Sequence, residues 1–211
     1  MIEKYLESTN LNKKANWKDI RGFVKVAEEE GFYGVCSYMY WANQMKKYTK
    51  NCKIICVIGF PQGSPLDIKK DLNIINNNVT DEYDVVVPLY YIKKKKYKDF
   101  LSQMKLVRKL TEGKVLKAII ETCILDEKEF KPVIKICELV GVDFIKTNTG
   151  LYNRKRPIEK DVELIKQYTK LPIKASGGIQ TLEQANKLIE MGVSRIGTSN
   201  PSRIIWEEKN K

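Results

Sequence analysis

Short apolar runs alternate with longer segments of helical period along all 211 residues of this chain. The short runs are rich in valine and isoleucine and fit buried strands; they lie at residues 5–9, 33–37, 54–59, 83–87, 116–121, 142–147, 172–175 and 195–198. The intervening segments have the spaced apolar residues of amphipathic helices; they lie at residues 17–30, 66–76, 98–111, 127–139, 159–168 and 181–191. This alternation predicts a series of βα units with parallel strands.

The βα units follow one another without a linker or a break in composition, so we expect one α/β domain over residues 1–211. A chain of this length with 43% hydrophobic residues can bury one substantial core. The number of strands favours a closed (β/α)8 barrel, although the chain is short for that fold. The alternative is an open doubly wound sheet, whose glycine-rich phosphate turn normally comes early, and none is found there.

Two lysines occupy apolar segments that end beside glycines. Lys146 lies in the sequence FIKTNTG and Lys174 in IKASGGI. Strand alternation turns both side chains toward the barrel interior, near the strand ends where barrel enzymes place their active sites. Burying an ammonium group is costly, so two inward lysines indicate amines that are kept there to react. The alternative for each lysine is that it extends from the strand end into solvent.

An amine of this kind suits Schiff-base formation with a carbonyl substrate. A free lysine has a pKa of about 10.4, and burial or a neighbouring ammonium lowers it, which yields more of the neutral nucleophile. We expect one lysine to attack while the other lowers its pKa and moves protons. Asp84 shares strand parity with Val86 and is a candidate carboxylate for the proton relay. It fits equally a surface aspartate at the start of a strand.

Glycine-rich turns follow the last three predicted strands and are candidates for holding a phosphate group. Glycines permit close backbone approach, and N–H groups at the start of a helix bind anions. Each turn alone also fits an ordinary βα connection. The candidate substrate- and phosphate-binding residues are Thr149, Gly150, Gly177, Gly178, Gly197 and Ser199.

The chain has no histidine, which excludes Ser–His and Cys–His nucleophile pairs and histidine metal ligands. Its five cysteines have no paired zinc spacing and predict reduced core thiols in a cytoplasmic protein. No apolar stretch has the length of a membrane span, so no membrane partner is expected. The net charge of +12 leaves open a nucleic-acid-binding protein that uses Lys93 to Lys96 and Arg154 to Arg156. We favour a dispersed basic surface, because that rival leaves the buried lysines unexplained.

The sequence resembles the deoxyribose-phosphate aldolase family in family order through nearly the whole chain. The matching stretches are VIGFPQG at 57–63, DEYD at 81–84, IIET at 119–122, DFIKTNTG at 143–150, KASGGI at 174–179 and RIGTS at 195–199. The resemblance implies a (β/α)8 barrel and a class I aldolase without metal or cofactor. Such an enzyme reversibly cleaves 2-deoxy-D-ribose 5-phosphate to D-glyceraldehyde 3-phosphate and acetaldehyde, in deoxyribonucleotide catabolism.

The resemblance also implies residue roles. Lys146 would be the Schiff-base lysine, Lys174 the second lysine and Asp84 the relay carboxylate. The glycines at 150, 177, 178 and 197, together with Ser199, fall where the family holds phosphate. Barrels of this size often associate, so a homodimer is the default expectation.

Several residues depart from the family pattern. Asn148 replaces the usual serine of Lys-Thr-Ser-Thr-Gly, Glu7-Ser8-Thr9 replaces Asp-His-Thr, and Leu151 follows the Thr-Gly pair where some members have lysine. These differences surround the expected sugar and phosphate positions. The alternative that they leave open is a related Schiff-base aldolase for another phosphorylated or small aldehyde substrate.

Overall fold

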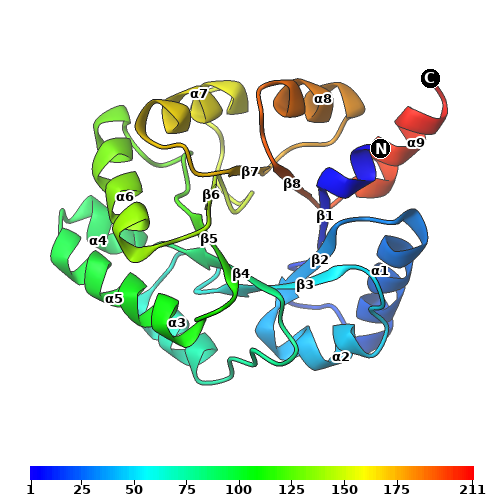
Figure 1. The fold of residues 1–211 in the computed structure, drawn as a ribbon, viewed down its shortest axis with the longest axis horizontal. Helices are drawn as coiled ribbons and strands as arrows, with labels where there is room; N and C mark the ends of the chain where they lie inside the picture. Colours follow the sequence, from blue (N-terminus) through cyan, green and yellow to red (C-terminus); the bar gives the residue numbers. More distant parts are fainter.

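The computed structural model describes residues 1–211, and its parallel strands close into a barrel in chain order (Figure 1). The first strand pairs with both the second and the last, so the sheet has no free edge. The strands are β1 (Leu6–Thr9), β2 (Gly34–Tyr38), β3 (Lys53–Ile58), β4 (Glu82–Val86), β5 (Val115–Ile119), β6 (Phe144–Lys146), β7 (Ile173–Ser176) and β8 (Arg195–Thr198). The prediction of a closed (β/α)8 barrel is confirmed, and the open sheet is excluded.

Helices surround the barrel as an outer ring (Figure 1). They are α1 (Trp17–Glu30), α2 (Ala42–Lys46), α3 (Pro65–Leu72), α4 (Leu89–Lys93), α5 (Tyr97–Leu110), α6 (Glu127–Val140), α7 (Ile158–Tyr168), α8 (Leu182–Glu190) and α9 (Pro201–Lys209), with 3-10 turns η1 (Ile2–Tyr5) and η2 (Met39–Trp41). None of these helices is both long enough and apolar enough to cross a membrane.

Capping residues fix both ends of α1, whose bounds agree with the predicted range 17–30. At the start of α1, the Asn16 side chain accepts hydrogen bonds from the backbone of Lys18 and Asp19, and Asp19 returns a bond to Asn16 N at 2.8 Å. The helix ends at Gly31, whose φ of 71° is favourable only for glycine. Such caps satisfy the unpaired N–H and C=O groups at helix ends, so they fix where a helix begins and ends.

Three helices were not predicted: α2, α4 and α9. The first two have five residues each, which is too short to show a helical period. The helix α9 follows the last strand and packs against α8. Strand β5 also ends earlier than expected: Glu121 was placed in the strand but has a φ of 54°, which lies outside the β region.

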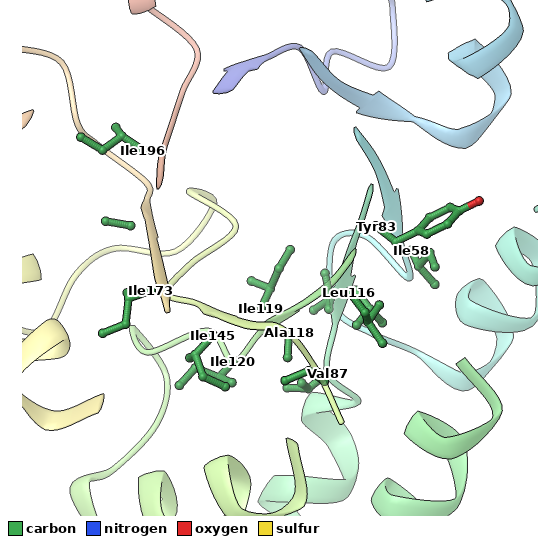
Figure 2. Close-up of a cluster of buried hydrophobic side chains, with 14 of the residues drawn as sticks. Ile58, Tyr83, Val87, Leu116, Ala118, Ile119, Ile120, Ile145, Ile173 and Ile196 are labelled. Carbon is green, nitrogen blue, oxygen red and sulfur yellow. The ribbon is translucent and has the colours of Figure 1, made fainter. Parts of the chain in front are cut away.

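The main core lies between the strands and the helices, in one cluster of 50 buried residues. Figure 2 shows Ile145 and Ile173 in this cluster, together with residues of the neighbouring strands. Because side chains alternate along a strand, an outward Ile145 places Lys146 inside the barrel, and an outward Ile173 does the same for Lys174. Each fully buried isoleucine contributes about 1.5–3 kcal/mol, so the packing of the outer core fixes which way the lysines point.

Candidate active site

Lys146 and Lys174 lie side by side inside the barrel. Their Cα atoms are register partners on β6 and β7, and the two residues are 3% and 0% exposed. Both ammonium groups donate to the same oxygen, Asp84 Oδ2, at 2.9 Å from Lys146 Nζ and 2.6 Å from Lys174 Nζ. Neither lysine extends into solvent. The structure thus brings together the three side chains that the sequence put forward as candidate catalytic residues.

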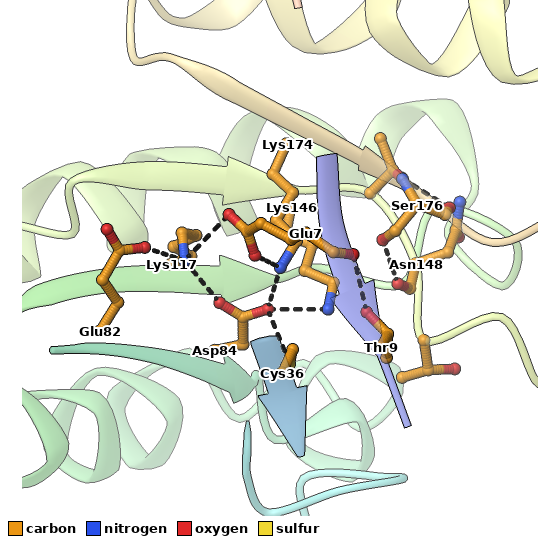
Figure 3. A network of polar contacts seen from close by, with 12 residues as sticks. Glu7, Thr9, Cys36, Glu82, Asp84, Lys117, Lys146, Asn148, Lys174 and Ser176 are labelled. Atoms are coloured by element: carbon orange, nitrogen blue, oxygen red, sulfur yellow. Dashed lines mark hydrogen bonds and ion pairs between the residues drawn. The ribbon is translucent and has the colours of Figure 1, made fainter. Parts of the chain in front are cut away.

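Asp84 is fully buried on β4 and is held from two sides. Its Oδ1 accepts a hydrogen bond from Lys117 Nζ at 3.0 Å, opposite the two lysines on Oδ2 (Figure 3). Burial raises the pKa of the Asp84 carboxyl, but Lys117, Lys146 and Lys174 together outweigh it and hold that pKa well below its ordinary value. Asp84 is therefore a carboxylate at neutral pH.

Two further carboxylates complete the cluster. Glu7, from β1, pairs with Lys174 and lies 3.4 Å from Lys117 Nζ through its Oε1. Glu82, from β4, lies 2.5 Å from Lys117 Nζ through its Oε2. Three ammonium groups therefore face three carboxylates in the barrel interior, and their formal charges cancel. This balance offsets the cost of burying each charge, which alone is prohibitive.

The carboxylates keep Lys174 charged. We expected Lys174 to be the neighbouring ammonium that lowers the pKa of the attacking lysine, Lys146. Burial does lower the pKa of Lys174, but Asp84 and Glu7 outweigh it and raise that pKa above its ordinary value. Lys117 shows the same balance, with its pKa raised by Asp84, Glu7 and Glu82 against burial. Lys174 and Lys117 therefore stay protonated at neutral pH.

Lys117 and Glu7 belong to this site but were not identified in the sequence. Lys117 lies in an apolar strand, VLKAI, that resembles the surroundings of Lys146, so a usable signal was present. Glu7 does not precede a glycine-rich turn, and its position in the sequence does not indicate that it contacts Lys174. It reaches Lys174 only because barrel closure places β1 next to β8, which in turn pairs with β7.

A pocket of about 190 Å³ opens above this cluster at the C-terminal ends of the strands. Lys146 lines it, whereas Asp84 and Lys174 lie beneath its floor. All six predicted substrate- and phosphate-binding residues line it as well: Thr149, Gly150, Gly177, Gly178, Gly197 and Ser199. A larger hollow of about 770 Å³ lies between α8 and α9, but it holds none of the clustered lysines and is not the candidate site.

The glycine turns after β6 and β7 approach each other closely. Gly150 and Gly177 have φ angles of 89° and 90°, which L side chains rarely adopt. A Cβ on Gly177 would lie 3.2 Å from the Gly150 Cα, so a larger residue would push the turns apart. Glycine at these positions is a requirement of the pocket wall.

Asn148, the residue that departs from the family serine, does not line the pocket. Its Oδ1 accepts hydrogen bonds from Thr122 Oγ1 at 2.9 Å and from Cys123 N at 3.0 Å. Its side chain therefore ties the end of β6 to the segment after β5. Glu121 strengthens the same connection by accepting from the backbone N and the hydroxyl of Thr149. The substitution alters the support behind the pocket rather than its surface.

Of the two basic runs offered for nucleic-acid binding, the arginines of the second are mostly covered. Arg156 Nε donates to the buried Asp161 at 2.6 Å, and Arg154 Nη1 lies 3.4 Å from the same carboxylate. The two arginine side chains are only 20% and 25% exposed. Lys93, at the start of the other run, pairs with Glu129. Arg154 and Arg156 are therefore tied into the barrel, whereas Lys93 to Lys96 remain exposed on the surface.

A closed (β/α)8 barrel with clustered lysines and carboxylates below a pocket at its C-terminal face has the arrangement expected of a lyase of the aldolase class. No family model matches the chain. It is 37% identical to the deoxyribose-phosphate aldolase of Aquifex aeolicus, over 98% of this chain and 95% of that protein.

Solved structures agree with this similarity. An aldolase called QR15 superposes with a TM-score of 0.92 at 37% identity, covering 99% of this chain and 96% of that one. The tetrameric deoxyribose phosphate aldolase of Aeropyrum pernix superposes with a TM-score of 0.86 at 26% identity, covering 99% and 91%. This chain belongs to the deoxyribose-phosphate aldolase family.

Proposed function

We propose that this protein reversibly cleaves 2-deoxy-D-ribose 5-phosphate to D-glyceraldehyde 3-phosphate and acetaldehyde, in deoxyribonucleotide catabolism, through a Schiff base on Lys146. The observation that carries the proposal is the shared carboxylate: Lys146 and Lys174 both donate to Asp84 Oδ2, and only Lys146 lines the pocket. The proposal takes residues 1–211 as one aldolase domain.

The different surroundings of the two lysines support their assignment. Lys174 pairs with both Asp84 and Glu7, and its pKa is raised, so it stays protonated and has a proton to donate. Lys146 pairs with Asp84 alone and faces the open volume where a substrate carbonyl would enter. A nucleophile needs access and a free lone pair, and Lys146 is the member of the pair with access.

In the proposed cleavage, Lys146 first loses its proton to solvent in the pocket, and the neutral amine then attacks C1 of the open-chain sugar to give a carbinolamine. Protonation of its hydroxyl releases water and leaves an iminium ion. The C3 hydroxyl then loses its proton, the C2–C3 bond breaks, and its electron pair enters the iminium to form an enamine. Glyceraldehyde 3-phosphate departs, C2 is protonated, and hydrolysis returns acetaldehyde and the free lysine.

Lys174 and Asp84 are placed to move these protons. Lys174 Nζ lies 2.6 Å from Asp84 Oδ2, which lies 2.9 Å from Lys146 Nζ, so each transfer crosses one short contact. Lys117 on the other oxygen keeps Asp84 ionised and fixed in orientation. The glycine turns at the far end of the pocket offer backbone N–H groups to the 5-phosphate.

A substrate panel tests this function. We expect 2-deoxy-D-ribose 5-phosphate to release glyceraldehyde 3-phosphate, measured by coupled reduction to glycerol 3-phosphate with NADH. The other substrates tested are ribose 5-phosphate and short aldehydes with and without a phosphate group. Faster turnover of one of these would favour the alternative, a Schiff-base aldolase with another substrate. Turnover of none would contradict the proposal.

Two further proposals concern the protein's setting. All five cysteines are buried and unpaired, which supports a reducing compartment such as the cytoplasm. A homodimer is proposed as the assembly, since exposed leucines such as Leu66 and Leu106 lie on outer helices. Light scattering of the purified protein tests the dimer; a monomeric or tetrameric mass would contradict it.

A further inference from the structure

Arg154 holds the outer side of the glycine turn that follows β7. It lies in the segment between β6 and α7, and its Nη2 donates to Ser176 O at 3.1 Å and to Gly177 O. Its Nε lies 3.8 Å from the position that a Cβ on Gly178 would take. The guanidinium therefore sits directly behind the backbone of the pocket wall without lining the pocket itself.

These two hydrogen bonds set the direction of the neighbouring N–H groups. In a trans peptide the C=O and the N–H point in opposite directions. Carbonyls of Ser176 and Gly177 that face Arg154 therefore turn the N–H groups of Gly177 and Gly178 away from it. Neither N–H donates to any acceptor in the protein, and both glycines line the pocket. Two free donors thus point away from the arginine on a turn that forms the pocket wall.

Charge supports the same conclusion. Lys146 is the only basic residue that lines the pocket, and it lies at the lysine cluster rather than at the glycine turns. Behind the turns, one buried carboxylate, Asp161, is shared by two guanidinium groups, those of Arg154 and Arg156. Arg156 is also anchored by the carbonyl oxygens of Thr122 and Leu125. The arrangement leaves positive charge behind the turn, where it favours a bound anion.

We propose that Arg154 is a positioning residue that gives this enzyme its preference for phosphorylated substrates. It directs the Gly177 and Gly178 N–H groups at the 5-phosphate and polarises their peptide groups from behind. No basic side chain lines the pocket beside the glycine turns, so the guanidinium acts from behind them. This proposal rests on the proposed function and names the residue that selects the substrate class.

The test compares Arg154→Gln and Arg154→Lys with the unmodified enzyme on 2-deoxy-D-ribose 5-phosphate and on unphosphorylated 2-deoxy-D-ribose. We expect Arg154→Gln to raise KM for the phosphorylated sugar about 10- to 100-fold, the effect of losing hydrogen bonds to a charged group. We expect kcat for that sugar, and kcat/KM for deoxyribose, to stay within about threefold. Arg154→Lys keeps the charge but not the fork of donors, so its KM should be intermediate.

Inorganic phosphate provides a direct probe of the same site. Its inhibition constant should rise in Arg154→Gln in parallel with KM for the phosphorylated sugar. The matched control is Arg203→Gln, because Arg203 is half exposed, pairs with Glu207 on α9 and does not line the pocket. Arg203→Gln should leave both sugars and phosphate inhibition unchanged.

An equal loss of kcat/KM on both sugars in Arg154→Gln and Arg154→Lys would overturn the proposal. It would show that Arg154 only stabilises the loop and has no effect on the preference for phosphate. Unchanged KM and unchanged phosphate inhibition would also overturn it. Borohydride trapping of acetaldehyde, which carries no phosphate, tests the proposed aldolase function independently of phosphate binding. Absence of an adduct in the unmodified enzyme counts against the aldolase function, whereas an adduct with unaltered phosphate binding in Arg154→Gln counts against Arg154 alone.

Discussion

Lys146 and Lys174 are register partners on adjacent strands, and their ammonium nitrogens share one acceptor, Asp84 Oδ2, at 2.9 and 2.6 Å. One lysine faces the pocket and the other lies below it between two carboxylates. The two lysines therefore have different surroundings. This difference is the basis for proposing Lys146 as the nucleophile and Lys174 as the acid.

Replacing Lys174 by leucine should leave the barrel folded but remove most activity near neutral pH. The relay loses its acid, and general acid–base groups contribute about 10²- to 10⁴-fold to rate. The change also leaves Glu7 and Asp84 with fewer cations, so stability should fall by about 3–5 kcal/mol. Steady-state kinetics and thermal melting measure the two effects. Full activity in Lys174→Leu would remove the lysine from the mechanism.

The stability contributed by Lys174 should depend on pH only in the alkaline range. The folded state raises its pKa, so its contribution is fully present below the unfolded value of about 10.4 and is lost as pH rises through the folded pKa. The difference in melting temperature between the unmodified protein and Lys174→Leu should be constant from about pH 7 to pH 10 and shrink above that. A difference that disappears below pH 9 would contradict the raised pKa.

Asp84→Asn should reduce activity at least about 100-fold, because it removes the charge that both reactive lysines share. Glu82→Gln is the matched control: Glu82 contacts Lys117 but neither Lys146 nor Lys174. Its loss should stay below about tenfold. Equal losses in the two variants, with equal melting temperatures, would show that any carboxylate in the cluster serves and that Asp84 has no special role.

The five thiols should be unreactive in the native protein. All are buried, and burial raises the pKa of Cys36 and Cys123 to about 11 and that of Cys52, Cys56 and Cys137 to about 12. Since the thiolate is the reactive form, Ellman's reagent at pH 8 should label none of them within minutes. It should label all five in guanidinium chloride. Rapid labelling of any native thiol would mean that the barrel opens locally.

The periodic features of the sequence predicted the barrel and the inward direction of the two lysines. A buried apolar neighbour on the outer face of the strand fixes the face of a strand lysine, as Ile145 and Ile173 do for Lys146 and Lys174. Glycine-rich turns after predicted strands identified Gly150 and Gly177, and the structure gives both a positive φ. Features that depend on residues close together in the chain could therefore be predicted from the sequence.

Contacts between strands that lie far apart in the sequence could not be predicted. Glu7 reaches Lys174 across 167 positions, and Asp84 reaches it across 90. Both distances close only when the sheet becomes a barrel, so no spacing rule reveals Glu7 as a partner. Without it, nothing in the sequence shows what keeps Lys174 protonated. The short helices α2 and α4 were not predicted for another reason: five residues do not complete two helical turns, so no period is visible.

Borohydride trapping with 2-deoxy-D-ribose 5-phosphate, followed by peptide mass mapping, tests the central claim most directly. Reduction of the Schiff base should leave a single stable adduct on Lys146, and Lys146→Met should abolish it. Lys117 and Lys174 are buried, protonated internal controls that should carry no label. An adduct on either of them, or none on the active enzyme, would contradict the assignment of Lys146 as the nucleophile.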